Sequence, residues 1–113
     1  MRIYVYYGIL STMSSDILSI QEEIFKLIGN QKRLEILLLL ENRELNVGEM
    51  TDMLGLRQVN LSQHLTLLRA QHLVEVRKKG RESFYTLADD SIAVAIRTIH
   101  DFLRKTHRIG APF

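Results

Sequence analysis

The fold is decided by residues 58–71, QVNLSQHLTLLRAQ, together with the segments LVEVR at 73–77 and SFYTL at 83–87. The first stretch repeats apolar residues at helical spacing, which predicts a helix. Its apolar face carries Leu61, Leu65, Leu68 and His72. The two later segments alternate with period two and flank a basic tip, KKGR at 78–81. The sequence therefore predicts a helix followed by a basic β-hairpin.

Further helical patterns lie on both sides of this unit. They predict helices over about 15–28 with Ser15 or Asp16 as the N-cap, over 32–41, over 47–54 with Gly55 ending it, and from Asp89-Asp90 to about Lys105. A short polar turn is expected at 42–46. The expected fold is mainly α with a small β-hairpin (α+β), in the order α-α-α-α-β-β-α.

Length and composition restrict the class of protein. The 113 residues, 46% hydrophobic and 25% charged, favour one domain at 14–107, with an extension of unassigned role at 1–13 and a tail at 108–113. The longest uncharged apolar run, 36–40, is far shorter than the about 20 residues of a membrane-spanning helix. The absence of cysteine excludes disulfides, thiolate metal sites and cysteine nucleophiles. We expect a soluble, cytoplasmic protein.

Charge is distributed unevenly along the chain. Residues 14–56 contain eight acids and four bases, whereas residues 57–81 contain six bases and a single acid, Glu75. A basic segment on an otherwise acidic domain is the electrostatic footprint of a surface that binds a polyanion. The alternative is a solvated basic surface without a ligand.

The outer face of the 58–71 helix has no acids. It carries Val59, Gln63, Thr66 and Ala70, flanked by Ser62 and Arg69. Small and amide side chains let a helix approach nucleic acid closely. The order of elements, with this helix before a basic hairpin, is typical of a winged helix-turn-helix domain.

The chain also resembles a known family at residue level. Residues 56–65, LRQVNLSQHL, continued by Leu68-Arg69 and Leu73-Val74, resemble the recognition-helix pattern L-S-Q-x-x-V-S-x-H-L-x-x-L-R-x-x-G-L-V of the ArsR/SmtB transcriptional repressors. The wing matches at Arg77, Gly80-Arg81, Tyr85 and Leu87, and the upstream helix matches at Asn30, Arg33 and Ile36-Leu37. The resemblance covers about residues 24–105 and implies a dimeric winged helix-turn-helix repressor.

Two positions depart from the family pattern. Arg57 replaces the usual serine at the start of the recognition helix, and His72 replaces the usual glycine before the first wing strand. The first change removes a capping hydroxyl, which costs about 1 kcal/mol unless another group caps the helix. It also places a cation beside the DNA.

The expected partner is double-stranded DNA, read in its major groove by one helix. We predict base and backbone contacts from Arg57, Gln58, Asn60, Ser62, Gln63, His64 and Arg69, with Thr66 as a phosphate contact. On the wing, Lys78, Lys79 and Arg81 are predicted to neutralise phosphates or enter the minor groove. For each helix position the alternative is an exposed residue without a contact, and His64 has a structural role as its alternative.

One recognition helix does not supply operator-level specificity, so a homodimer on an inverted repeat is expected. In the family the first and last helices form the dimer interface. The corresponding apolar residues here are Ile17, Ile20 and Ile24 in the first helix and Ile92, Ile96, Ile99 and Leu103 in the last. Packing within one chain is the alternative for these residues, and the two roles do not exclude each other.

The family's sensing sites are not retained. The arsenic and lead sensors carry two cysteines where this chain has Asn46 and Gly48. The zinc and cobalt site aligns with Asp89, but Ser91, Phe102 and Lys105 occupy the other ligand positions. We therefore expect no metal and no cofactor, with a displaced site at Asp90, His100 and His107 as the alternative.

An enzyme and a protein-contact module are the two alternatives to a DNA-binding protein. An enzyme is not expected, because the chain has no nucleophile-base constellation and no phosphate-binding glycine loop. A winged-helix module that contacts another protein is the stronger rival. An acidic recognition helix would favour that module, so the acid-free helix favours DNA.

Overall fold

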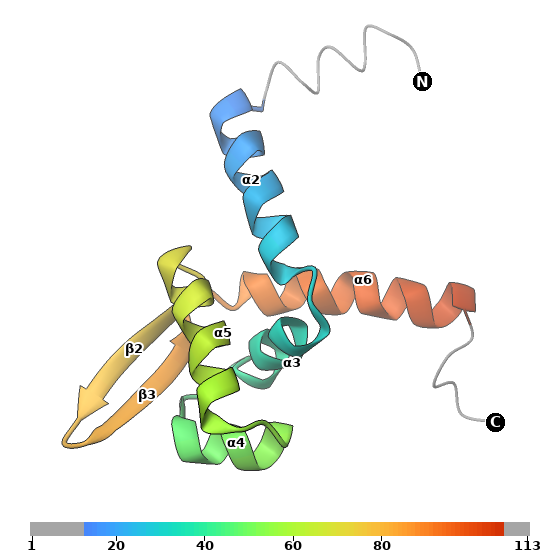
Figure 1. Cartoon of the computed structure of the whole chain (residues 1–113). Helices are drawn as coiled ribbons and strands as arrows, with labels where there is room; N and C mark the ends of the chain where they lie inside the picture. Colours follow the sequence, from blue (N-terminus) through green and yellow to red (C-terminus); the bar gives the residue numbers. More distant parts are fainter. Residues whose placement is uncertain (1–12, 108–113) are drawn as a thin grey trace, which may run out of the picture.

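The computed structural model describes residues 13–107, and its elements follow the predicted order (Figure 1). They are α2 (Ser15–Ile28), α3 (Gln31–Leu39), β1 (Leu45–Asn46), α4 (Val47–Leu54), α5 (Gln58–Ala70), β2 (Val74–Lys79), β3 (Glu82–Leu87) and α6 (Ser91–His107). The winged helix-turn-helix fold is confirmed. The strand β1 is an addition, since the sequence predicts only a turn at 42–46. Apart from Met13, the predicted extension and the tail at 108–113 lie outside the described residues.

Within the described residues, a three-stranded antiparallel sheet has the order β1-β3-β2. Strands β2 and β3 pair from Val74–Leu87 to Lys79–Glu82. Gly80 forms the tip with a φ of 63°, a left-handed conformation that is free of steric cost only for glycine. Strand β1 pairs with the middle of β3, which attaches the hairpin to the start of α4.

The core lies between α3, α4, α5, the start of α6 and the base of the hairpin. Leu61, Leu65 and Leu68 of α5 are buried, which confirms the helical face expected from their spacing. They pack in one cluster with Ile36, Leu37, Leu40, Leu45, Met50, Leu73, Val74, Leu87, Ala93 and Ile96. The outer face of α5 is left for other contacts.

Helix α5 ends in a Schellman turn, earlier than predicted. The Leu73 N–H donates to the Leu68 carbonyl at 3.0 Å, and the His72 N–H donates to the Arg69 carbonyl at 2.9 Å. His72 has a φ of 60°, the left-handed conformation that this turn requires and that glycine adopts most easily. His72 is therefore exposed in the turn, and its predicted place on the apolar face of the helix is wrong.

Helix α4 is held at both ends by local hydrogen bonds. The Asn46 Oδ1 accepts from the Glu49 N–H at 2.8 Å, and the Glu49 carboxylate accepts from the Asn46 N–H at 2.9 Å. This reciprocal capping box fixes the start of the helix. Gly55, with a φ of 64°, ends the helix as predicted.

Helices α2 and α6 extend away from this body in different directions (Figure 1). Ser14, rather than Ser15 or Asp16, caps α2, because its Oγ accepts from the Ile17 N–H at 3.4 Å. Helix α2 has no fully buried residue, and α6 buries only Ala93 and Ile96. Both helices thus leave most of their surface uncovered by the single chain.

Among residues 13–107, no helix combines the length and the apolar character needed to pass through a bilayer.

Candidate nucleic-acid interface

The outer face of α5 is exposed and free of carboxylates. At 100° per residue, Val59, Gln63 and Thr66 point away from the buried leucines, and all three are exposed. Gln58, Ser62 and Asn60 are also exposed, beside this face. The Thr66 hydroxyl donates to the Ser62 carbonyl at 2.8 Å, so its hydrogen is engaged within the helix. The exposed groups of this face are amides, hydroxyl oxygens and methyl groups.

The start of α5 carries positive charge instead of a side-chain cap. Arg57 occupies the N-cap position with extended backbone angles, φ −71° and ψ 147°, and makes no side-chain capping hydrogen bond. The first N–H groups of a helix carry a partial positive charge, and the guanidinium adds to it. This end of the helix therefore attracts an anion such as a phosphate group.

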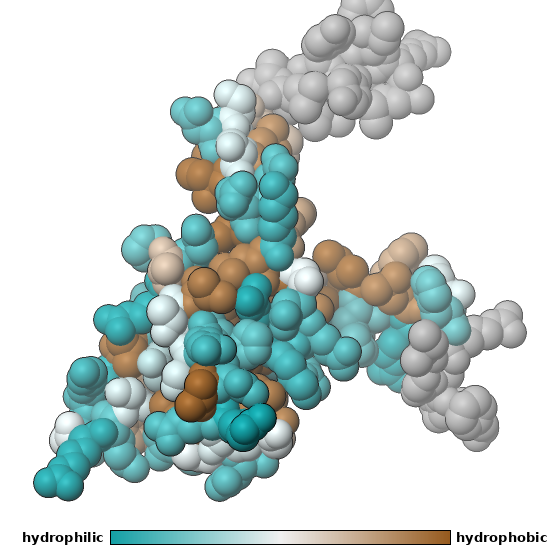
Figure 2. Space-filling model, in the orientation of Figure 1, coloured by the Kyte–Doolittle hydropathy of each residue, from teal (hydrophilic) through white to brown (hydrophobic). Residues whose placement is uncertain are grey.

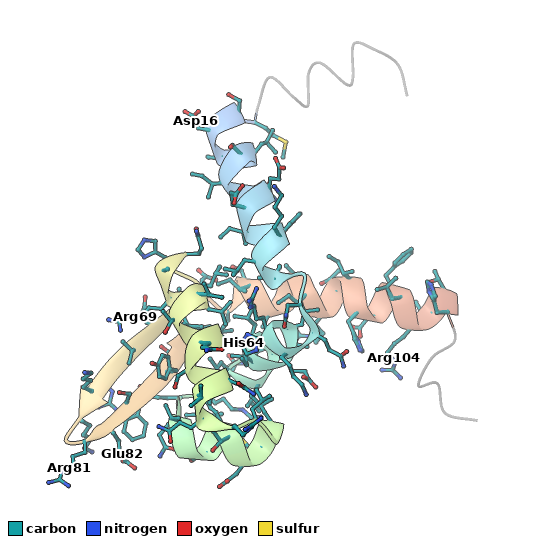
Figure 3. All side chains as sticks on the ribbon, viewed as in Figure 1. Asp16, His64, Arg69, Arg81, Glu82 and Arg104 are labelled. Carbon is teal, nitrogen blue, oxygen red and sulfur yellow. The ribbon has the colours of Figure 1, made fainter. Side chains whose placement is uncertain are left out.

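The wing presents cations at its end. Lys78, Lys79 and Arg81 are exposed around the Gly80 turn, and Arg81 projects away from the body at the tip (Figure 3). Glu82 lies opposite Lys79, and its Oε1 accepts from the Asn46 Nδ2 at 3.5 Å. The predicted wing residues therefore share one tip.

Arg77 has a different role from the other wing cations. Its Nη2 and Nε donate to the two carboxylate oxygens of Glu44 at 2.7 and 3.2 Å, and its guanidinium lies 5.2 Å from the Phe84 ring centroid. The hydrogen bond from Arg77 holds the pKa of Glu44 below its usual value. Arg77 therefore ties the wing to the chain before β1.

His64 lies on the inner side of α5, toward α3. It is half-buried, and its Nδ1 accepts from the Arg33 Nε at 3.2 Å, while the Arg33 Nη1 donates to the Leu27 carbonyl at 3.0 Å. Burial lowers the pKa of His64, and the charge of Arg33 lowers it further. This contact is the structural alternative considered for His64. It links the end of α2 to the recognition helix.

The structure does not gather all predicted contact residues in one place. Arg57 at the N-cap and Gln58, Ser62 and Gln63 lie at the start and in the first half of α5. Arg69 lies at its far end (Figure 3). There Arg69 borders a shallow hollow with His72 and Glu75.

The predicted dimer residues divide into two groups. Ile17, Ile20, Ile99 and Leu103 are exposed, at 64%, 59%, 59% and 44%. Ile96 belongs to the core, and Ile24 and Ile92 pack against it, so these three residues pack within one chain. Their role in the dimer stays a prediction.

Two exposed aromatic residues were missed. Phe25 on α2 and Phe102 on α6 are 57% and 60% exposed. The spacing of Phe25 from Leu18, seven residues apart on one face, was the signal for the first. Phe102 stands at a lost metal-ligand position of the family, and no apolar pattern indicated that its ring is exposed for contact. Figure 2 shows apolar surface along α2 and along the upper side of α6.

The candidate metal residues have other partners. The Asp89 Oδ1 accepts from the Ser91 N–H at 2.8 Å at the start of α6. Hydrogen bonds from the Ser91 side chain and from its backbone lower the pKa of Asp89. The Asp90 Oδ1 accepts from the Asn42 N–H at 3.3 Å, and the His100 Nδ1 lies 3.5 Å from Asp101. Within residues 13–107 of one chain, no three His, Asp or Glu side chains are grouped so as to hold a metal ion.

An acid-free helix beside a cationic hairpin defines the class of protein as a winged helix-turn-helix DNA-binding regulator. The model of the bacterial regulatory protein ArsR family matches residues 30–76. The chain belongs to the ArsR family. As expected, the family comprises regulators of transcription and not enzymes.

Individual relatives agree with this assignment. The transcriptional activator HlyU of Vibrio cholerae is 42% identical over 77 residues, which are 68% of this chain and 71% of HlyU. The biofilm growth-associated repressor of Agrobacterium fabrum is 34% identical over 77 residues, 68% of this chain and 66% of the repressor.

Two solved structures show the same fold. HlyU from Vibrio cholerae superposes with a TM-score of 0.71 at 37% identity, covering 80% of this chain and 97% of HlyU. NolR from Sinorhizobium fredii superposes with a TM-score of 0.65 at 33% identity, covering 88% of this chain and 97% of NolR.

Proposed function

We propose that this protein is a homodimeric regulator that binds an inverted-repeat operator in double-stranded DNA and represses transcription by occupying it. The observation that carries the proposal is the acid-free outer face of α5 beside the cations of the wing tip. In this arrangement α5 enters the major groove, and Gln58, Ser62 and Gln63 meet base edges. The exposed Asn60 meets the DNA at the edge of this surface.

Cations surround this base-reading surface. Arg57 at the start of α5, Lys78, Lys79 and Arg81 on the wing, and Arg69 at the end of α5 are all exposed. We assign them to the phosphate backbone, where each contact releases counterions and makes affinity fall with salt. His64 supports the orientation of α5 through Arg33 instead of contacting a base.

The dimer is inferred from the apolar surfaces of α2 and α6. Ile17, Ile20, Phe25, Ile99 and Phe102 expose more than half of their surface in the single chain. Burying this surface against a second copy supplies the association energy, and the two-fold symmetry places two recognition helices on the two half-sites.

The regulator is proposed to act without the family's metal and thiol switches. Asn46, at one of the two cysteine positions of the arsenic and lead sensors, instead caps α4. Repression follows from the resemblance to the ArsR/SmtB repressors. The relatives include both an activator, HlyU, and a repressor, the biofilm growth-associated repressor of Agrobacterium fabrum, so the direction of regulation requires its own test.

The test is a fluorescence-anisotropy titration of labelled inverted-repeat DNA from the protein's own upstream region, at two salt concentrations, with and without Zn²⁺. We expect saturable, salt-dependent binding that zinc does not change. Release by zinc would instead support the displaced site at Asp90, His100 and His107. No binding at either salt concentration would overturn the proposal in favour of a protein-contact module.

Two variants separate the proposed roles. Arg81→Ala is expected to weaken binding to all DNA sequences and to reduce the salt slope by about one per wing. Gln63→Ala is expected to weaken operator binding while random DNA is little affected. Lys26→Ala, which removes an exposed cation paired with Glu22 on α2, is the matched control. Equal losses of affinity for operator and random DNA in both variants would contradict the assigned roles. In vitro transcription from the operator promoter tests whether the protein represses or activates.

A further inference from the structure

The centre of the proposed DNA-reading surface contains an apolar residue. Val59 lies in the first turn of α5 and is 67% exposed. It lines a shallow surface hollow together with Gln58, Ser62, Gln63, Thr66 and Leu67. Figure 2 shows a small apolar patch on the otherwise largely hydrophilic surface where α5 meets α4.

The packing of the domain does not account for a valine at this position. Leu61, two residues further along α5, is fully buried, whereas Val59 faces away from the core and is not part of the hydrophobic cluster. A β-branched side chain also loses rotamer freedom in a helix, so it gives the exposed helix surface no gain over alanine. Contact with a ligand therefore explains an exposed valine at this position better than the stability of the fold does.

The ligand chemistry follows from the neighbours of Val59. Gln58 and Gln63 are exposed on either side of it, and a glutamine amide pairs with the N6 and N7 atoms of adenine in the major groove. The apolar group displayed in the same groove is the C5 methyl of thymine, on the partner of adenine. An apolar side chain between two amides thus matches an A·T-containing step. The N-terminal part of a recognition helix is also the part that contacts base edges.

We propose that Val59 is a specificity-determining residue that packs against the C5 methyl group of one thymine in each operator half-site. This inference rests on the proposed function and adds to it the chemistry of one recognised base. Burying a methyl group corresponds to about a fourfold change in affinity for each half-site.

The experiment compares operators in which deoxyuridine replaces thymine at one position of both half-sites, which removes only the methyl group. Wild-type protein is expected to bind about 15-fold more weakly when the contacted position is changed, because the effect occurs twice. Val59→Ala is expected to bind the thymine operator about equally weakly and to show a thymine-to-uracil ratio near one. Val94→Ala, the same truncation at an exposed valine of α6 outside this hollow, is the matched control and keeps the wild-type ratio.

The outcomes separate this inference from the proposed function. Specific operator binding with the same thymine-to-uracil ratio in wild type and Val59→Ala would overturn the role of Val59 alone. Absence of any specific operator binding would overturn both. A second series with 5-methylcytosine for cytosine distinguishes the two sources of a C5 methyl group. A gain there without a loss in the uracil series would assign Val59 to a methylated cytosine and overturn the thymine assignment.

Discussion

The body of the domain and its two extended helices differ in how much of their apolar surface is buried within one chain. In the body, α3, α4, α5 and the hairpin enclose leucine, isoleucine and methionine side chains with no exposed surface. In contrast, α2 has no fully buried residue, and the outer half of α6 exposes Ile99, Phe102 and Leu103. The same kind of amphipathic pattern thus produces a finished core in one region and an uncovered apolar surface in the other.

The largest predicted effect concerns the body. Leu61→Ala removes a fully buried side chain and is expected to lower the free energy of unfolding by about 2–5 kcal/mol, through lost burial and the cavity that remains. Urea denaturation at fixed protein concentration measures it. Val59→Ala, on the outer face of the same helix, should change stability by less than about 0.5 kcal/mol. Similar losses in both variants would contradict the assignment of the two faces.

The second prediction concerns the uncovered surface. Ile99→Ala is expected to weaken dimerisation about 30-fold, since a symmetric interface loses about 1 kcal/mol in each of two copies. Sedimentation equilibrium measures the dissociation constant. Lys105→Ala, on another side of α6, serves as the control. If both variants associate as the wild type does, then this part of α6 does not form the dimer interface.

The third prediction concerns the entry to α5. Arg57→Ser introduces a capping hydroxyl and is expected to stabilise the domain by about 1 kcal/mol, because the N-cap has no side-chain hydrogen bond at present. Operator affinity should fall at the same time, since a cation near phosphate is lost. Arg57→Ala separates the two effects, as it removes the charge without adding a cap. Equal thermal stability of the two variants would show that the serine does not cap.

The smallest predicted effect is a pH dependence at the link between the two regions. The pKa of His64 is lowered in the folded chain by burial and by Arg33, so the unfolded chain binds a proton at a pH where the folded chain does not. Stability therefore falls as the pH falls from the usual histidine pKa of about 6.5 through the lower folded value. His64→Asn keeps an acceptor near Nδ1 and does not titrate. Between pH 7 and pH 5, denaturation should show a smaller loss of unfolding free energy in this variant than in the wild type. Equal losses would show that the titration of His64 does not cause the pH dependence.

Periodicity predicted most of this fold. The buried face of α5 was predictable because the spacing of Leu61, Leu65 and Leu68 within one helix is a local pattern. The alternating segments on both sides of Gly80 predicted the hairpin. Strand β1 could not be predicted, because a strand of two residues has no period of its own and exists through its pairing with β3.

The candidate site was predictable in its composition but not in its orientation. Ile96 and Ile99 belong to the same apolar face of α6, yet one is in the core and the other is exposed, because only the first part of α6 packs against the body and the rest extends beyond it (Figure 1). The partner of His64, Arg33, is 31 residues away in the chain, and only the folded arrangement brings the two together.

The wing is attached to the rest of the domain at two places, through strand β1 and through the Arg77–Glu44 ion pair. Because β1 joins the base of the hairpin to α4, and Arg77 joins its middle to Glu44, the separation between the Arg81 tip and α5 is set within one chain. In the proposed dimer, the number of base pairs in the spacer between half-sites is expected to depend instead on α2 and α6. We therefore expect spacer length and groove geometry to be recognised by different parts of the molecule. A substitution at the proposed dimer surface should change the preferred spacing of the half-sites and leave the preferred half-site sequence unchanged.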